Sequence, residues 1–321
     1  WIDKLIESMS ELALWHVSKE KSEWRSVEER EPPAGYVWIE ALYSLISTGT
    51  ERLVARGEVP MEAHEIMRVP YQEGSLGLPV KYGYSLVGKV RAPGHALDGR
   101  VVHLLHPHQS GGWVDPAHCY PVPEEAPARR AVLASNLETA VTAVWDSGIS
   151  IGDRVGVVGF GMIGGLLARL LSGMPGLELF VVEKDPHRRT LAAGMGFRVT
   201  APGENPQDLD VAFHTTATGP GLQLALDAVA REGKVVELSW YGGRETSLQL
   251  GGGFHYGRKQ IVSSQVSHLP PDRLPRWDAG RRKAVVFRLL QADGYDRHLT
   301  HELTMADTPA FFERLRRGEV V

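Results

Sequence analysis

The 321-residue sequence has a single cysteine, Cys119, and no long apolar run. One cysteine cannot form an intramolecular disulfide, and it cannot build a metal site from several thiolates. No apolar stretch approaches the roughly 20 residues that a membrane-spanning helix needs. The sequence therefore excludes a disulfide scaffold and a multi-cysteine metal site, and we expect a cytoplasmic protein with no membrane partner.

A large charge of one sign is also missing, because 35 basic and 39 acidic residues leave a net charge of −4. A charge of this size gives no reason to expect a nucleic-acid partner. The N-terminus shows no basic region followed by an apolar stretch, so we see no signal peptide. Met9 looks like a natural start, and we expect residues 1–8 to be vector-derived or upstream sequence.

The first third of the chain has the pattern of a β-rich domain. Short apolar runs at 36–44, 82–89 and 100–105 are separated by Gly and Pro, which is typical of strands joined by turns. The pattern changes at 126–145, where Ala, Leu and Val recur at helical spacing.

Strands and helices alternate over the next hundred or so residues. The predicted strands are 155–158, 179–183, 197–199, 210–214 and 234–238, and the predicted helices begin at 163, 188 and 221. Such alternation indicates an α/β fold with a parallel sheet covered on both faces. The tail predicts helices at 284–292 and 308–317, with a strand-like piece at 299–303 between them.

A glycine motif follows the first of these strands. Gly159, Gly161 and Gly164 form G-x-G-x-x-G, and Glu183 lies 19 residues beyond the last glycine. In a strand–turn–helix context this pattern predicts a doubly wound dinucleotide-binding domain. The cradle for the phosphates also includes Met162 and Ile163, because the first N–H groups of a helix bind anions.

Residues around this motif indicate which nicotinamide cofactor is bound and where it lies. Glu183 favours NAD, because a carboxylate accepts ribose hydroxyls and repels a 2′-phosphate, whereas Lys184 and Arg188 leave NADP open. The loop after the next core strand carries Thr215 and Thr216, and Trp240 follows the strand after that. We expect these three residues beside the nicotinamide or, alternatively, in the core.

The chain from about residue 9 onward resembles the medium-chain dehydrogenase/reductase superfamily. The residues that carry this resemblance are Ser47-Thr48-Gly49-Thr50-Glu51, Gly83-Tyr84-Ser85-Leu86-Val87-Gly88 and the glycine motif. The resemblance implies a GroES-like β domain at 9–128, a Rossmann domain at 129–270 and a return to the first domain at 271–321. The run 46–53 is similar to bacteriochlorophyllide dehydrogenase in particular.

The zinc ligands of the superfamily have no counterpart here. The positions of the family's two cysteines and one histidine match Thr48, Ser135 and Tyr84, and the four-cysteine lobe is missing. Neutral hydroxyls bind zinc poorly compared with thiolate or imidazole. The resemblance therefore implies a nicotinamide-dependent protein for which we expect no zinc.

Without zinc, hydrogen-bond donors would have to polarise a substrate oxygen. Thr50 and Tyr84 match positions that face the substrate in the family, although either can instead be a structural hydroxyl. Glu51 is a further candidate, or only a group that orients another. His106 and His108 lie two residues apart; one can act as general acid/base, or the pair packs a loop or scavenges metal.

Three functions follow from these residues. The first is alcohol–ketone interconversion by hydride transfer on a small-molecule substrate, and the second is reduction of an activated C=C bond. The third is an NAD(P)-binding protein with no catalysis. The strand-like run 260–266 predicts a sheet edge through which a homodimer would form.

Overall fold

The structure is a computed structural model that describes residues 11–28 and 31–320. These residues divide into two compact units, which are treated separately below. The first unit holds the described residues up to 135, together with 287–291 and 301–320, and the second holds 136–286 and 292–300. The expected start at Met9 and the segment 1–8 lie outside the described residues.

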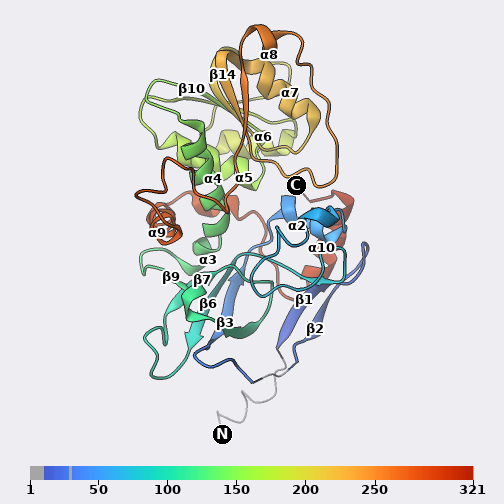
Figure 1. Cartoon of the computed structure of the whole chain (residues 1–321), viewed down its shortest axis with the longest axis vertical. Coiled ribbons are helices and arrows are strands. Elements are labelled where there is room, and N and C mark those ends of the chain that lie inside the picture. The colour runs from blue at the N-terminus through green and yellow to red at the C-terminus, as the bar shows by residue number, and fades with distance from the viewer. Residues whose placement is uncertain (1–10, 29–30, 321) are drawn as a thin grey trace. The chain divides into compact units, whose positions relative to one another are not determined.

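The first unit is built on two antiparallel sheets (Figure 1). One has the strand order β2-β1-β5-β4, and the other has the order β8-β3-β6-β7-β9. The strands are β1 (Leu12–His16), β2 (Ser22–Ser26), β3 (Val37–Ser44), β4 (Glu73–Gly74), β5 (Val80–Lys81), β6 (Leu86–Arg91), β7 (Val101–Leu104), β8 (Gly111–Val114) and β9 (Tyr120–Pro121). The predicted strands at 36–44, 82–89 and 100–105 are confirmed, although the second begins only at Leu86.

Alternation along β3 explains how this unit forms its core. Val37 and Ile39 are buried while Glu40 is exposed, as expected of a strand with one covered face. Helices close the sheets: α2 (Thr48–Ala55), α3 (Ala128–Ala131) and α10 (Thr308–Arg317), with the 3-10 turns η1 (Met61–Ala63) and η2 (Pro116–His118). Phe312 of α10 is fully buried against Leu14 of β1.

The second unit contains a six-stranded parallel sheet in the order β12-β11-β10-β13-β14-β15. Its strands are β10 (Arg154–Val158), β11 (Glu178–Val182), β12 (Val199–Thr200), β13 (Leu209–His214), β14 (Val229–Glu237) and β15 (Gln260–Ser263). Numbered along the chain, this order is 3-2-1-4-5-6, the doubly wound arrangement. The predicted parallel α/β sheet is confirmed, and the order reverses between β10 and β13.

Helices flank this sheet (Figure 1). They are α4 (Ala134–Ser147), α5 (Met162–Ser172), α6 (Pro186–Gly194), α7 (Gly219–Ala228), α8 (Gly253–Tyr256) and α9 (Ala279–Leu290), with the 3-10 turn η3 (Tyr295–His298). The strand predicted at 299–303 is wrong: residues 300–303 are exposed, and no strand of the described chain pairs with them. None of the helices in the described ranges is long and apolar enough to cross a bilayer.

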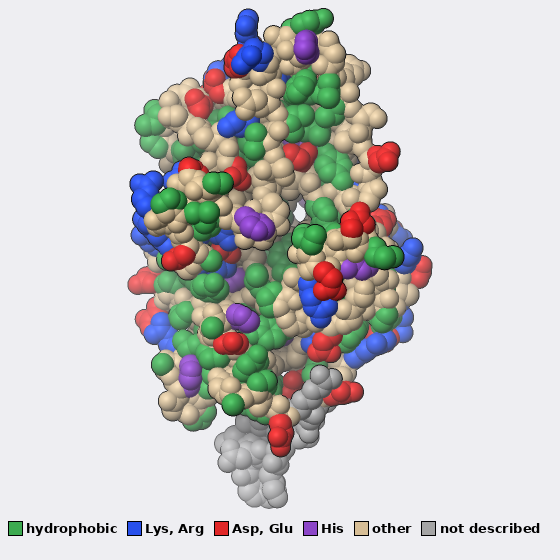
Figure 2. Space-filling view, in the orientation of Figure 1, with side chains coloured by type: hydrophobic (Ala, Val, Ile, Leu, Met, Phe, Trp, Pro, Cys, Tyr) green, Lys and Arg blue, Asp and Glu red, His purple; other side chains and the backbone are tan. Residues whose placement is uncertain are grey.

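Buried charges fix α9 within the second unit. The Glu138 carboxylate of α4 binds Arg282 Nε at 3.2 Å and Lys283 Nζ at 2.5 Å, and all three residues are buried. Figure 2 shows Lys and Arg side chains gathered over the segment that contains α9. Near the start of α9, the Arg281 guanidinium lies 4.0 Å from the ring centre of Trp277, where a cation–π contact forms.

We predict that Glu138→Leu lowers the free energy of unfolding by about 3–5 kcal/mol, because it leaves two buried cations without their carboxylate. The matched control is Glu178→Leu, which removes a half-exposed partner of Arg154 and costs less than about 1 kcal/mol. Urea denaturation of both variants measures the difference. Equal losses would show that the buried cluster adds no more than a surface ion pair.

Candidate functional site

The glycine turn of the second unit is built by close backbone approach. A Cβ on Gly164 would overlap the carbonyl oxygen of Gly159, and Gly159 itself has a φ of 102°. Only glycine satisfies both requirements without strain. The turn leads directly into α5, whose first residues are Met162 and Ile163, so its free N–H groups and positive dipole end lie at the motif.

Glu183 follows β11 and its carboxylate lies under the turn. One oxygen accepts the N–H of Phe160 at 2.6 Å, and the other accepts the N–H of Asp185 at 2.8 Å. The residue is buried at 5% exposure. Each carboxylate oxygen has a second lone pair, so these bonds leave acceptor capacity for ribose hydroxyls.

Basic residues surround this acid. The Arg189 guanidinium donates to the carbonyl oxygens of Glu183 and Lys184 at 3.0 and 2.7 Å, so it is engaged by the backbone. Arg188 is placed differently: its Nη1 lies 3.7 Å from where a Cβ on Gly161 would stand. The Arg188 guanidinium is therefore the positive charge nearest to the phosphate cradle among those named.

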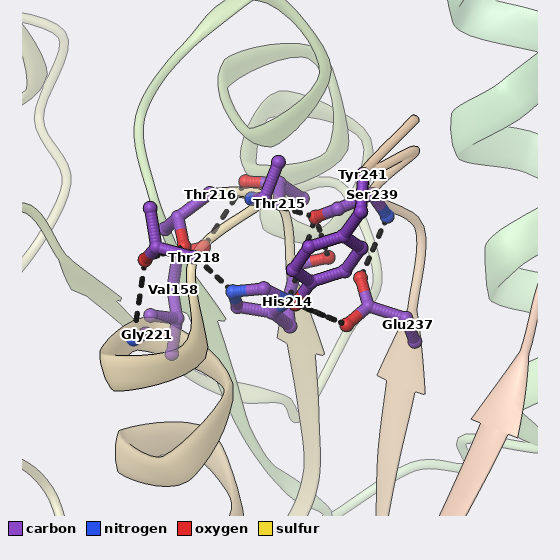
Figure 3. A network of polar contacts seen from close by, with 10 residues as sticks. Val158, His214, Thr215, Thr216, Thr218, Gly221, Glu237, Ser239 and Tyr241 are labelled. Carbon is purple, nitrogen blue, oxygen red and sulfur yellow. Dashed lines mark hydrogen bonds and ion pairs between the residues drawn. The ribbon is translucent and has the colours of Figure 1, made fainter. Parts of the chain in front are cut away.

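The loop after β13 packs into the same turn. The Thr215 hydroxyl lies 3.0 Å from the carbonyl oxygen of Val158 and 3.1 Å from that of Gly159. Thr216 and its neighbours form a polar network that Figure 3 shows at the ends of β13 and β14. Trp240 lies half-buried just beyond β14. The structure thus gathers Thr215 and Thr216 at the glycine turn.

A second polar group lies in the first unit, around the fully buried Glu51 of α2. One carboxylate oxygen accepts the Ser47 N–H at 2.7 Å, and the other lies 2.6 Å from His108 Nε2. The opposite ring nitrogen, Nδ1, lies 2.6 Å from the hydroxyl of Ser44, which is exposed. A continuous chain therefore runs from a surface hydroxyl through an imidazole to a buried carboxylate.

The Ser44 hydroxyl has a second neighbour, the carbonyl oxygen of Ser85 at 3.1 Å. Its single proton can be donated either to that carbonyl or to His108 Nδ1, depending on the tautomer of the ring.

The Tyr84 hydroxyl lies in the same unit. Burial, followed by the charge of Glu51, raises the pKa of Tyr84, while side-chain hydrogen bonds with Ser47 and Thr50 act in the opposite direction. The phenol therefore stays protonated near neutral pH and can donate a hydrogen bond. The structure thus brings the predicted residues Thr50, Glu51, Tyr84 and His108 together.

His106 is not part of this group. Its Nδ1 lies 2.8 Å from the carbonyl oxygen of Pro107, and its ring stacks on Tyr71 with centres 5.0 Å apart. Burial lowers the pKa of His106 to about 4, with smaller contributions from the charges of Lys81 and His108, against the Pro107 bond. The ring is therefore neutral at physiological pH, and its contacts are those of a packed core residue.

Hydroxyl groups at and beside the positions that the resemblance matches to zinc ligands have other partners. The Ser135 hydroxyl donates to the carbonyl oxygen of Tyr84 at 2.9 Å, and the Ser85 hydroxyl donates to that of Val132 at 2.6 Å. Within residues 11–28 and 31–320, no three His, Cys, Asp or Glu side chains converge as a metal site. The donor set of Thr48, Tyr84 and Ser135 does not fit zinc.

Sequence reasoning missed Ser44 and Glu237. Ser44 ends β3, and only the fold brings it to His108, which lies 64 positions later. Glu237 is a charged residue directly after the apolar pair Val235–Val236. This pattern could have predicted that a strand ends there and that its last side chain enters a polar site. Neither residue carries a motif of its own.

The chain was compared with protein families and with curated proteins. No protein-family model matches the chain. D-guloside 3-dehydrogenase of Escherichia coli (strain K12) is 26% identical over 186 residues, which cover 54% of this chain and 53% of the relative. (R,R)-butanediol dehydrogenase of Bacillus subtilis (strain 168) is 26% identical over 144 residues, covering 41% and 42%. The chain spans about half the length of the curated relatives it matches.

Solved structures match over almost the whole chain. A protein of Sinorhizobium meliloti 1021, described as a zinc-binding dehydrogenase bound to NADP, has a TM-score of 0.75 at 17% identity and coverage of 95% and 96%. Acetophenone reductase of Geotrichum candidum NBRC 4597 in complex with NAD has a TM-score of 0.73 at 16% identity and coverage of 97% and 95%. These matches confirm the predicted fold, a GroES-like β unit and a Rossmann unit.

We predict that Gly164→Ala abolishes dinucleotide binding, because the added methyl group forces the Gly159 carbonyl out of the turn. Gly194→Ala, at the end of α6, is the matched control, since nothing lies within 4 Å of its added Cβ. Quenching of intrinsic tryptophan fluorescence by NADH and NADPH measures both variants. Wild-type affinity in Gly164→Ala would contradict the assigned turn.

The buried state of His106 predicts a pH dependence of stability. Its pKa of about 4 lies below the ordinary value near 6.5, so the unfolded chain binds the proton more tightly. The stabilisation is complete above about pH 6.5 and is lost as the pH falls toward 4, which amounts to about 3 kcal/mol. His106→Gln should lose less stability than wild type between pH 7 and 4 in urea denaturation, and equal losses would contradict this.

Proposed function

We propose that this protein is an NAD(P)(H)-dependent oxidoreductase that interconverts an alcohol and a ketone or aldehyde by hydride transfer, without zinc. The observation that carries the proposal is the glycine turn at the point where the sheet order reverses, with Glu183 beneath it. The names of the curated relatives support the reaction class, since both are dehydrogenases acting on hydroxyl-bearing compounds.

The second unit fits the dinucleotide. Gly161 leaves the backbone open to phosphate oxygens, Gly159 and Gly164 make the tight turn that leads to it, and the start of α5 supplies N–H donors. Glu183 favours NAD, as expected from its charge, and Arg188 is the group that would admit the 2′-phosphate of NADP. When bound, the nicotinamide supplies the hydride acceptor or donor, and this chain supplies the orientation and the proton transfer.

The first unit contains groups suited to the proton transfer that accompanies hydride transfer. Oxidation of an alcohol releases a hydride from carbon and a proton from oxygen, so a protein group must take the proton. In this proposal Tyr84 or Thr50 donates to the substrate oxygen, and Tyr84 stays neutral because burial and Glu51 raise its pKa. The contacts that link Glu51, His108 and Ser44 support a role for these three residues in carrying a proton to the surface.

Zinc independence rests on the side chains themselves. Thr48, Tyr84 and Ser135 are neutral hydroxyls, and those of Tyr84 and Ser135 are engaged in hydrogen bonds. A neutral hydroxyl is a poor zinc ligand beside thiolate or imidazole. We also propose that the protein is a cytoplasmic homodimer paired through β15, whose outer edge is unpaired in the described chain.

Hydride transfer itself is the test. The purified protein is supplied with NADH or NADPH deuterated at nicotinamide C4, a chelator, and a panel of ketones and activated alkenes. We expect deuterium on the carbinol carbon of a ketone product, at a rate that chelation does not change. Deuterium only in reduced alkenes would replace the proposal with C=C reduction, and a rate abolished by chelation would contradict zinc independence.

Tyr84→Phe is the variant that tests the proton donor, and Tyr82→Phe is its matched control. The two rings are neighbours at 6.2 Å between centres, but only Tyr84 has hydrogen bonds with Ser47 and Thr50. We expect Tyr84→Phe to lower kcat by about 10²-fold or more and Tyr82→Phe to stay near wild type. Equal effects would mean that the Tyr84 hydroxyl has no special role.

A further inference from the structure

A buried imidazole–carboxylate pair lies at the carboxyl end of the parallel sheet (Figure 3). His214 ends β13 and Glu237 ends β14, and the two residues stand opposite each other in the strand register. His214 Nδ1 lies 2.7 Å from Glu237 Oε2, and the His214 side chain is completely buried. Burying such a pair is costly unless its remaining polar atoms are satisfied, so its placement calls for an explanation.

All the polar atoms of the pair are used, and they point toward the same loop. His214 Nε2 lies 2.6 Å from the Thr216 hydroxyl, and Glu237 Oε1 accepts the Ser239 N–H at 2.7 Å. The Ser239 hydroxyl in turn accepts the N–H of Ala217 at 3.0 Å. Glu237 therefore reaches the loop by two routes, one through His214 to Thr216 and one through Ser239 to Ala217.

These contacts close a ring around a strained backbone position. Ala217 has a φ of 52°, in the left-handed region that non-glycine residues seldom adopt. The ring of Glu237, His214, Thr216, Ala217 and Ser239 holds this conformation from both sides. Without it, the loop would relax toward ordinary backbone angles and Thr216 would move.

The loop is also what braces the glycine turn. A Cβ on Gly159 would stand 2.8 Å from both Thr215 Oγ1 and Thr216 Cγ2, so these side chains fill the space that the glycine leaves. Thr215 also donates toward the Val158 and Gly159 carbonyls. On its other side, Thr216 lies 2.8 Å from the Thr218 hydroxyl, which caps α7 by accepting the Gly221 N–H.

We propose that His214 and Glu237 are positioning residues for the dinucleotide: they hold loop 215–218 against the glycine turn and so set the affinity for the cofactor. This inference rests on the proposed function as an NAD(P)(H)-binding enzyme. The pair itself does not touch the ligand. The effect of His214 on binding passes through Thr216, which is the only loop side chain that contacts the His214 ring among the hydrogen bonds of the described residues.

A double-mutant cycle on the full-length protein tests the proposal. His214→Leu removes the imidazole, Thr216→Val removes the hydroxyl at nearly constant volume, and the third variant carries both changes. The measurement is the Kd for NADH and NADPH from tryptophan fluorescence quenching. We expect each single variant to raise Kd about tenfold and the double variant to raise it about tenfold as well, because both changes break one chain of contacts.

Two further variants separate positioning from general stability. Thr216→Ser keeps the hydroxyl and should restore wild-type Kd. Ser264→Ala removes a part-buried hydrogen bond to Asp146 but keeps the backbone bond from Ser264 N–H to the Glu237 carbonyl, so it should lower the melting temperature without changing Kd. At saturating cofactor, kcat of Ser264→Ala should stay at the wild-type value, because this residue belongs to neither the cofactor site nor the proton-transfer group.

The outcomes are distinguishable. Single variants with wild-type Kd, or effects that multiply to about a hundredfold in the double variant, would overturn the positioning role. A raised Kd in Ser264→Ala equal to that in His214→Leu would assign the effect to stability and also overturn it. If the wild-type protein binds neither NADH nor NADPH, the proposed function is wrong and the inference falls with it.

Discussion

The close approach of α5 to the carbonyl of Gly159 is the constraint on which the second unit depends. No side chain fits at Gly164, and the φ of Gly159 is one that other residues avoid. Three separate strands send polar groups to this turn: Glu183 from β11, Thr215 from β13 and, through a longer path, Glu237 from β14. The turn is thus held rigidly at the place where the sheet order reverses, which is the property a phosphate cradle needs.

The first unit is likewise organised around a buried carboxylate whose oxygens are satisfied by nearby donors. The Glu51 carboxylate is fully buried, and it is acceptable there because a backbone N–H and an imidazole satisfy it. Burial, and after it the charge of this carboxylate, raises the pKa of Tyr84 and keeps the phenol protonated. We propose that this network of hydroxyls, one imidazole and one carboxylate polarises the substrate oxygen.

The sequence predicted the second unit well because its information is local. The motif from Gly159 to Gly164, the acid at Glu183 and the alternation of apolar strands all lie in one continuous segment. Contacts between distant segments were not predictable in the same way. Nothing near Ser44 in the sequence indicates His108, and nothing near His214 indicates Glu237, because strand register and not spacing brings them together. The false strand at 299–303 has a different origin: this segment is mostly polar, and no strand of the described chain pairs with it.

The central claim is that the glycine turn and its supports bind a nicotinamide dinucleotide. Isothermal titration calorimetry of the wild-type protein with NADH and with NADPH tests it most directly, since it gives stoichiometry and affinity together. The account predicts one site per chain and tighter binding of NADH, because the Glu183 carboxylate repels a 2′-phosphate. No heat of binding with either dinucleotide, at concentrations up to millimolar, would contradict the account.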